Sequence, residues 1–314
     1  MRVVQGSKVF PSEFQHGIVT IGNFDGLHLG HQMIMETVKQ RARHLGSQSA
    51  VFTFEPHPRK VIRPASAPPL LTTLDQKLEL LELAGVGVVV IEEFTEEFAR
   101  YDAADFVTEV IHARMKPKEV YVGFDFHFGR DREGSRNSLA SLGPVLGFSV
   151  TVIPEVTVEG QTVNSTRIRR LLSEGEVEAS ERLLGRPYSV TGKVIKGDQR
   201  GRTIGFPTLN LDCDNEVLPL EGVYSTEVRF EDPNLGREWM ASVTNVGRRP
   251  TFKEEDPVLA EAHVFNFSSD VYGERIELRF RHHIRREKKF SNPEELVKQI
   301  RSDAEAARER LHSP

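Results

Sequence analysis

Residues 18–45, IVTIGNFDGLHLGHQMIMETVKQRARHL, decide the fold of the first half of the chain. A β-branched run at 18–21 ends in Gly22, a turn-forming Asn-Phe-Asp-Gly follows, and apolar residues at helical spacing begin after His31. This order predicts a strand, a tight loop and a helix. In an open α/β sheet, ligands bind where the chain leaves the carboxyl end of a strand, and the amino end of the following helix favours an anion. We therefore expect a phosphate group at this loop.

His28 and His31 are candidate phosphate ligands. Their spacing places them on one face of the helix start, and Gly30 between them has no side chain to keep a phosphate from the backbone. Two other interpretations stay open on these residues alone, because the histidines could be metal ligands or ordinary surface residues. The single cysteine of the chain supplies none of the additional partners that the strong zinc patterns need.

The stretch GNFDGLHLGH resembles the HxGH signature of the nucleotidyltransferase superfamily, and its GNFDG part is similar to the flavin adenylyltransferase type. The resemblance implies an S-T-x-x-R run further along, and VNSTRIRRLL at 163–172 supplies it, with Asn164 where Ser is usual. Without the first motif, a simple helix cap would explain this run. The resemblance implies that His28, His31 and Arg169 are catalytic residues that act on the phosphates. It implies ATP contacts for Gly22, Asn23, Phe24, Asp25, Gly30, Ser165 and Thr166.

Two further loops leave predicted strands, TFEPHP at 53–58 and GFDFHFG at 123–129. Aromatic residues at strand ends are usually core, but aromatic faces beside polar groups also suit a flat heteroaromatic ring. Both loops are similar to those that hold the flavin in FAD synthetases, and the RDREGS that follows the second loop departs from that family. The resemblance implies flavin contacts for Phe54, His57, Pro58, Phe124, Asp125, Phe126 and Phe128.

Composition bounds the class of protein. A chain of 314 residues favours two domains, and a net charge of −5 argues against general nucleic-acid binding. The basic run at 281–289 is more typical of a solvated face than of a nucleic-acid patch. The single Cys213 suits a reducing compartment, and the sequence shows no signal-peptide h-region and no apolar run long enough for a membrane span. We expect a cytoplasmic protein, and the sequence does not fix its oligomeric state.

The rest of the first half alternates predicted strands and helices. Such alternation predicts a doubly wound parallel sheet. The expected strands are 2–4, 50–54, 86–91, 119–123 and 148–153, and the expected helices are 74–84, 102–115, 139–146, one after 166, and 177–184. Gly185-Arg186-Pro187 breaks the pattern, so we expect one domain at 1–185 and another at 186–314.

Beyond this boundary, short β segments at 188–195, 222–230, 239–246, 262–267 and 275–281 are separated by turns. They predict a small antiparallel β-barrel, and a capped helix is expected from 291 to about 311.

The segment GKVIKGDQRGRTIGFPTLN at 192–210 carries glycines around two arginines, a flap suited to phosphates. Thr208 and Asn210 face the same side of an extended chain and can hold a magnesium ion. A glycine-rich hairpin with an Asx-type turn is the alternative. The candidate ATP-binding residues of this segment are Gly197, Gly201, Arg202, Gly205 and Pro207.

This half is similar to riboflavin kinase along nearly its whole length. The resemblance rests on GRTIGFPTLN at 201–210, TNVGRRPTF at 244–252, EAHVFNF at 261–267 and VYGERIELRFRHHIRREKKF at 271–290. It implies that Glu261 is the general base, that Thr208 and Asn210 are catalytic, and that Arg285 binds flavin. Arg286 replaces a frequent proline.

Together the two halves resemble the bacterial bifunctional riboflavin kinase/FAD synthetases. The resemblance implies phosphorylation of riboflavin by ATP to FMN, then adenylylation of FMN by ATP to FAD and pyrophosphate, with Mg2+ assisting both steps. The implied partners are riboflavin, FMN, FAD and ATP. Two rivals remain at this stage: a nucleotidyltransferase with another acceptor whose barrel only binds flavin, and a non-catalytic flavin-binding protein.

Overall fold

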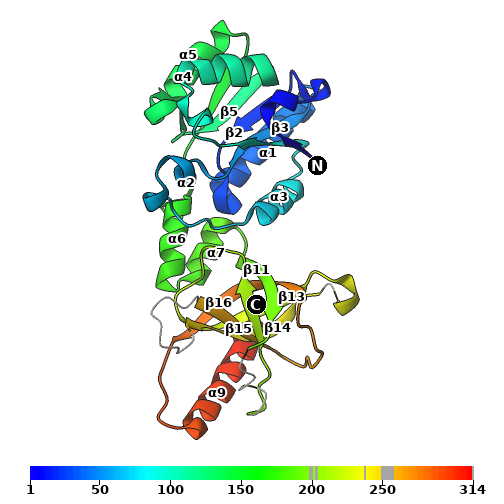
Figure 1. Ribbon diagram of the computed structural model, residues 1–314, viewed down its shortest axis with the longest axis vertical. Helices are drawn as coiled ribbons and strands as arrows, with labels where there is room; N and C mark the ends of the chain where they lie inside the picture. The colour runs from blue at the N-terminus through cyan, green and yellow to red at the C-terminus, as the bar shows by residue number, and fades with distance from the viewer. Residues whose placement is uncertain (198–200, 202–203, 237, 249–257, 313–314) are drawn as a thin grey trace. The chain divides into compact units, whose positions relative to one another are not determined.

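The computed structural model describes residues 1–197, 201, 204–236, 238–248 and 258–312. The chain divides into two compact units, Met1–Asn164 and Ser165–Pro314 (Figure 1).

The first unit is built on a six-stranded sheet whose strands are all parallel. The order across the sheet is β1-β4-β3-β2-β5-β8. The strands are β1 Arg2–Gln5, β2 Ile18–Ile21, β3 Ser49–Glu55, β4 Val88–Glu93, β5 Glu119–Gly123 and β8 Ser149–Ile153. All six strands of this sheet were predicted and are confirmed, with shifts of one or two residues at some ends.

Helices cover both faces of this sheet, as the βαβ pattern predicted. The main helices are α1 Leu29–His44, α3 Leu74–Leu83, a π-helix at Phe106–Met115 preceded by α4 Ala103–Asp105, and α5 Arg136–Val145. Side chains of α1 and α3 pack on one face, against Ile18, Val51 and Val89. The π-helix and α5 pack on the other face, against Val19 and Phe52. The sheet is doubly wound, because β2 has β3 on one side and β5 on the other.

Several short elements were not predicted. They are α2 Pro58–Ile62, the hairpin of β6 His127–Phe128 and β7 Gly134–Ser135, the hairpin of β9 Thr157–Val158 and β10 Gln161–Thr162, and the 3-10 turns Ser7–Val9, Ser12–Phe14, Asp25–Leu27, Pro64–Ser66, Phe98–Arg100 and Arg130–Arg132. The predicted helix at 139–146 begins earlier, at Arg136, because Ser135 and Ser138 form a capping box.

The second unit opens with two helices, α6 Ser165–Glu174 and α7 Val177–Leu184. A closed six-stranded barrel follows, in the order β11-β12-β15-β14-β13-β16, with all neighbouring strands antiparallel. Its strands are β11 Tyr188–Ile195, β12 Leu209–Cys213, β13 Gly222–Phe230, β14 Met240–Arg248, β15 Val258–Val264 and β16 Arg275–Arg286, with a 3-10 turn at Pro233–Leu235.

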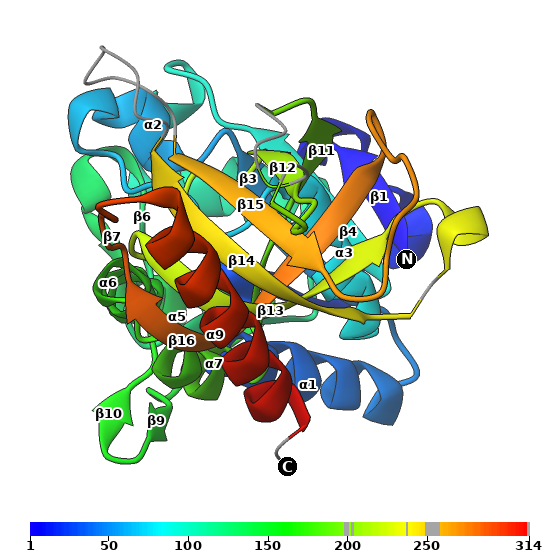
Figure 2. The same cartoon turned by 90° about the horizontal axis from the view of Figure 1, so that it is seen from below.

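The barrel was predicted, but three of its strands differ from the expectation. Strand β15 spans Val258–Val264 rather than 262–267, and β16 continues to Arg286 rather than ending at 281. Strand β12 closes the barrel from a segment that we expected only to be extended. The last helix, α9 Pro293–His312, begins where the Asn-Pro cap predicted, with Asn292 Oδ1 accepting from Glu295 N at 2.9 Å. It lies along β13, β14 and β16, and Ala304 and Ala307 join Val223 and Val243 in a core cluster beneath it (Figure 2).

The compact units divide between Asn164 and Ser165, so α6 and α7 belong to the barrel unit. The functional boundary between 185 and 186 stays a prediction. Among the described residues, none of the helices is long and apolar enough to cross a membrane.

Candidate functional site

Three loops of the first unit, those predicted to bind ATP and flavin, leave neighbouring strands at the same edge of the sheet. Residues 22–28 follow β2, residues 56–58 follow β3, and residues 124–128 follow β5. Strand β2 lies between β3 and β5, and parallel strands end at a common edge. The structure therefore brings the three loops together at the position where open α/β sheets bind ligands.

The loop after β2 is packed from within by one aromatic ring. Phe24 has left-handed backbone angles, with φ 51°, and its ring is buried. A Cβ atom at Gly22 would lie 2.9 Å from that ring, so glycine is required there for space. Thr53 of β3 donates to the carbonyl of Asn23 at 3.3 Å. Gly22 and Phe24 thus shape the loop, which leaves the Asn23 side chain as the polar group between them.

Asp25 ties this loop to the segment before α3. Its buried carboxylate accepts from the backbone N–H of Leu71 at 2.9 Å and from that of Thr72 at 3.2 Å. The Thr72 hydroxyl in turn accepts from Gly26 N at 3.2 Å. A carboxylate with several donors in a buried place is a strong structural lock. Asp25 was predicted to bind ATP, and the structure places it beneath the loop as a support.

His28 and His31 lie together at the amino end of α1. Their rings stack with centroids 3.6 Å apart, and His28 Nδ1 accepts from His31 N at 3.4 Å, which makes His28 the N-cap. Phe24 meets His31 edge-on at 5.3 Å. A Cβ atom at Gly30 would lie 3.2 Å from the His28 ring, so Gly30 gives that ring room. Two imidazoles and a positive helix end face the same region, an arrangement suited to phosphates.

The aromatic residues of the predicted flavin loops divide between core and surface. Phe54 packs against Phe52 and Phe98, and Phe128 is buried beside Phe106. Phe126 stacks on Phe128 at 5.5 Å. These three rings belong with the main core of the unit.

Phe124 and Asp125 are the more accessible part of the same loop. Phe124 is half-buried and Asp125 is exposed. The Phe124 carbonyl accepts from Arg136 Nη1, and His127 Nδ1 bonds the Asp125 carbonyl at 2.8 Å. In the loop after β3, His57 caps α2 by accepting from Arg59 N at 3.1 Å, and Pro58 begins that helix.

Lys77 near this edge was missed by the sequence analysis. It lies on α3, four residues after the N-cap Thr73, and only 5% of its surface is exposed. Burial lowers the pKa of its ammonium group, while the negative charges of Glu55 and Asp25 act in the opposite direction. Its helical spacing among leucines gave no sign of this, because a lysine at such a position is usually solvent-exposed.

The second half of the nucleotidyltransferase signature lies in the second unit. Ser165 and Thr166 open α6, and Arg169 follows on the same helix, whose buried residues are Ile168 and Leu172. The prediction that this run opens a helix is confirmed.

In the barrel, the register places the predicted catalytic pair side by side. Asn210 of β12 is directly opposite Glu261 of β15. Side chains directly opposite in antiparallel strands point to the same face, with Cβ atoms about 5 Å apart. Asn210 is buried and Glu261 is half-buried.

Two described glycines of the glycine-rich segment, Gly197 and Gly201, lie close to Asn210 and Thr208. A Cβ atom at Gly197 would lie 2.4 Å from Asn210 Nδ2, and one at Gly201 would lie 3.5 Å from Thr208 Oγ1 and 2.3 Å from the Phe206 carbonyl. The predicted Gly197, Gly201, Thr208 and Asn210 therefore converge. Gly205 has φ 85° with open space around it, and the Pro207 carbonyl bonds His263 Nδ1 at 2.8 Å. Arg202 lies outside the described residues.

The oxygen groups here fit a cation that is held mainly by phosphates. Asn210 Oδ1 is buried and has no hydrogen-bond partner within the described part of the chain, and Thr208 lies two residues before it along the chain. The described residues contain no group of three His, Cys, Asp or Glu side chains that could hold a metal alone. Neutral oxygens that leave coordination places for ATP are the kind of ligand that magnesium accepts.

Two more residues, Arg285 and Asn245, lie on this face of the barrel, on the side of Glu261 away from Asn210. Arg285 was predicted to bind flavin, and its guanidinium forms a paired contact with the buried carboxylate of Asp303 on α9, the shortest distance being 2.7 Å. Asn245 of β14 was not singled out, although it lies in the TNVGRRPTF motif. It is directly opposite Glu261, on the side away from Asn210.

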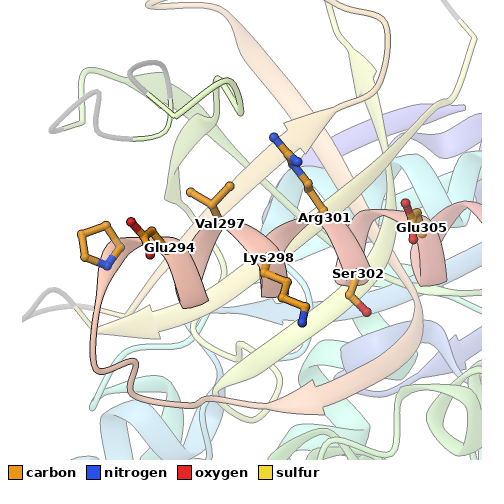
Figure 3. A pocket seen from close by; sticks show the side chains of 7 residues that line it. Glu294, Val297, Lys298, Arg301, Ser302 and Glu305 are labelled. Carbon is orange, nitrogen blue, oxygen red and sulfur yellow. The ribbon is translucent and has the colours of Figure 1, made fainter.

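A hollow of about 550 Å³ lies along α9, away from these residues (Figure 3). Its lining comes from one side of that helix, with Val297 as the apolar member among Glu294, Lys298 and Arg301. It contains none of the predicted site residues.

The fold and the two sites define a two-part transferase class: a doubly wound nucleotidyltransferase unit with an HxGH loop, followed by a small barrel with a Thr-x-Asn segment opposite a glutamate. The family model of FAD synthetase matches residues 10–167, and that of riboflavin kinase matches residues 184–311. The chain belongs to the family of bifunctional riboflavin kinase/FMN adenylyltransferases. It is an enzyme with a FAD synthetase domain and a riboflavin kinase domain.

Curated relatives with that name match over almost the full length. The one from Haemophilus influenzae is 36% identical over 308 residues, which covers 98% of each chain. The one from Escherichia coli strain K12 is 35% identical over 310 residues, or 98% of this chain and 97% of the relative. The one from Bacillus subtilis is 36% identical over 295 residues, or 92% and 91%.

A crystal structure titled as a macrolide-efflux protein from Streptococcus pneumoniae is also similar. It has a TM-score of 0.86 and 29% identity, and the match covers 98% of this chain and 99% of that one. The macrolide efflux in this name refers to the Streptococcus pneumoniae protein alone.

Proposed function

We propose that this chain phosphorylates the terminal ribityl hydroxyl of riboflavin with ATP in the barrel unit, giving FMN and ADP, and then transfers AMP from a second ATP to FMN, giving FAD and pyrophosphate. The observation that carries the proposal is the register that sets Asn210 directly opposite Glu261, beside the glycine-rich segment. The three-loop edge of the first unit supports the second reaction. Both reactions agree with the names of the relatives.

In the kinase reaction, Glu261 takes the proton of the ribityl hydroxyl as that oxygen attacks the γ-phosphorus. A carboxylate within hydrogen-bond reach of the hydroxyl is the general base that this step requires. Gly197 and Gly201 bring backbone close to the phosphates, and Thr208 and Asn210 hold the phosphate end. Most of the barrier is lowered by positioning and by neutralisation of charge.

Families of this kind, which transfer groups from ATP, generally need a divalent metal ion, and we propose Mg2+. Thr208 and Asn210 would hold it, and when bound it supplies positive charge that offsets the phosphate oxygens. The buried Oδ1 of Asn210, which has no partner among the described residues, supports this assignment.

In the adenylyl transfer, the nucleophile is the phosphate of FMN, so no base and no covalent enzyme intermediate are needed. The site has to bring two anionic groups in line and stabilise the pyrophosphate that leaves. We assign His28 and His31 to the phosphates of ATP and Asn23 to its orientation. Ser165, Thr166 and Arg169 are assigned to the leaving pyrophosphate, on the basis of the signature they complete. Phe124, which lies outside the core cluster that contains Phe126, and the exposed Asp125 are the favoured flavin contacts. His57 and Pro58, in the loop after β3, are proposed with them.

We further propose that the protein acts in the cytoplasm, where ATP is plentiful and where its single cysteine can remain reduced. No nucleic-acid partner is proposed, in keeping with the negative net charge.

The experiment that tests the function is incubation of the purified chain with riboflavin, ATP and MgCl2, with the flavins separated at successive times. FMN that appears first and FAD that follows would support both reactions and their order. FMN alone would remove the adenylyltransferase assignment for flavin, and a first unit that acts on another phosphate ester would then be favoured. No product at all would overturn the proposal in favour of a flavin-binding protein.

A further inference from the structure

Asn245 lies in a row of side chains that crosses the outer surface of the barrel. The register gives the row directly: Asn210 is opposite Glu261, Glu261 is opposite Asn245, Asn245 is opposite Val223, and Val223 is opposite Arg285. Directly opposite residues in antiparallel strands share a face, so all of these side chains project to the same side of the sheet. Successive members are about 5 Å apart.

The order of this row has a chemical direction. Asn210, with Gly197 against it, lies at the end assigned to phosphate. A general base in phosphoryl transfer lies between the phosphate donor and the hydroxyl acceptor, because it takes the proton of the attacking oxygen. Asn245 lies beyond Glu261 on the side away from Asn210, which is the acceptor side. Arg285, the predicted flavin residue, lies still further along the same row.

The space around Asn245 is suited to a polar guest. Its side chain is half-buried, whereas the next residue of the row, Val223, is 5% exposed and packs beneath α9. Gly247 lies two residues along β14 on the same face, and a Cβ atom there would lie 3.3 Å from Asn245 Nδ2. Oε1 of Glu287 would lie equally close to that Cβ atom, at 3.3 Å, so the glycine leaves room for two polar side chains at this place. A carboxamide both donates and accepts hydrogen bonds, which matches a secondary hydroxyl group.

We propose that Asn245 binds the polyol chain of the acceptor, with its carboxamide hydrogen-bonded to a secondary hydroxyl of the ribityl group. The inference rests on the proposed kinase function and adds a residue that selects the acceptor. It makes Asn245 a discriminator between a polyol chain and a plain alkyl chain on the same flat ring, since a polar group left unpaired by the wrong substrate lowers its binding.

The test compares two acceptors in the full-length chain. One is riboflavin, and the other is an analogue with the same ring system and an unbranched ω-hydroxyalkyl chain of the same length. The variant Asn245→Leu keeps the approximate size of the side chain and removes its hydrogen bonds. We expect the KM for riboflavin to rise about tenfold, as for one lost hydrogen bond, with the KM for ATP unchanged. The KM for the analogue should be the same in the variant and the wild type.

Asn245→Ser guards against misfolding, because it is small and keeps a hydroxyl; it should retain part of the preference for riboflavin over the analogue. Asp212→Asn is the matched control, an exposed residue on β12 two positions from Asn210, and it should leave both KM values unchanged. Thermal unfolding shows whether each barrel is intact.

Two results would overturn the inference. The first is an Asn245→Leu variant with an unaltered KM for riboflavin, and the second is an equal loss for riboflavin and the analogue, which would mean a purely structural role. Failure of the proposed function gives a different result, since the wild-type chain would then phosphorylate neither acceptor.

Discussion

His28 and His31 stack ring on ring, 3.6 Å between centroids, at the amino end of α1. The contact fixes both imidazoles on the same face. The backbone N–H of His31 donates to His28 Nδ1, and this hydrogen bond keeps the His28 ring in place. The two histidines thus form one structural unit, in which each ring limits the orientation of the other. Loss of either ring should affect the position of its neighbour as well as the contact that it makes itself.

His31→Ala should stop FAD formation and leave FMN formation intact, so FMN accumulates in the coupled assay. The variant removes one imidazole and the stacking partner of the other. We expect a fall in adenylyl transfer of about 10²-fold or more, because groups that stabilise charge in a transition state contribute at this level. The measurement is FAD formation from supplied FMN.

The internal control for this variant is its own kinase activity on riboflavin. A His31→Ala protein that is folded but loses both activities would contradict the assignment of the reactions to separate sites.

Asp25→Asn should weaken the first unit and its activity together. Oδ1 accepts from the backbone N–H groups of Leu71 and Thr72 and from the Thr72 hydroxyl, and Oδ2 also accepts from Leu71 N at 3.2 Å. Asparagine removes the negative charge and replaces one of these oxygens with an NH2 group, which cannot accept. We expect a loss of about 1–3 kcal/mol in the free energy of unfolding of this unit. Chemical denaturation measures the free energy of unfolding, and a separate assay of FAD formation from supplied FMN measures the activity.

Asp75→Asn, an exposed position on α3, is the matched control and should leave FAD formation unchanged. Because Asp75 lies in the first turn of α3, loss of its charge should lower the free energy of unfolding by less than about 1 kcal/mol. If Asp25→Asn lost activity at unchanged stability, Asp25 would be a ligand of ATP, as the motif alone predicts, and its supporting role would be secondary.

Glu261→Gln should reduce FMN formation by about 10²–10⁴-fold, the usual contribution of a general base. FAD formation from supplied FMN should continue at the wild-type rate. The KM for ATP should change little, because the glutamine keeps the size of the side chain opposite Asn210. Steady-state kinetics of the two half-reactions checks this. A variant with near wild-type kcat would exclude Glu261 as the base.

Gly197→Ala should impair the kinase reaction alone. The added methyl group would lie 2.4–2.5 Å from the atoms of the Asn210 carboxamide, so that side chain or the segment must move. We expect a higher KM for ATP in FMN formation and an increased requirement for MgCl2, since Asn210 is assigned to the metal. Titration of both ligands provides the measurement. Normal kinetics at every MgCl2 concentration would remove Asn210 from the phosphate end.

Much of this architecture could be predicted because its patterns are local. The β-branched runs that became β2 and β4 and the Asn-Pro cap of α9 each have one favoured structure. The π-helix at Phe106–Met115 could not be predicted, because its apolar spacing is also that of an α-helix. The strand β12 was missed as a barrel strand because it follows a segment rich in glycine and proline, which usually marks a turn.

In the candidate sites too, local motifs could be predicted from the sequence, whereas contacts between distant segments could not. Motif residues such as His28, Asn210 and Glu261 are recognisable one by one, but their neighbours are set by pairing across the sheet. Asn245 becomes meaningful only through the register of β14 with β15. Lys77 becomes meaningful only when α3 packs beside the loop that contains Asp25. Conversely, Phe54 and Phe128 stand in a flavin-like motif, and the fold uses their rings in its core.

The far end of α1 carries the last prediction. Arg41, in the last turn of α1, holds both carboxylate oxygens of Glu119 at the start of β5, with Nη2 to Oε1 at 2.8 Å, and the Tyr121 hydroxyl donates to Glu119 Oε2 at 3.0 Å. The Arg41 hydrogen bonds, with that of Tyr121, lower the pKa of Glu119 below its ordinary value of 4.5. The stabilisation is therefore fully present above pH 4.5 and is lost as the pH falls through the lowered pKa.

Glu119→Gln should accordingly lose stability at pH 7, and its free energy of unfolding should fall less steeply than that of the wild type below pH 4.5. Denaturant unfolding at a series of pH values tests this, and identical slopes for the two proteins would contradict it. Because the histidines lie at the opposite end of α1, the rate of FAD formation by the folded variant at pH 7 should equal that of the wild type.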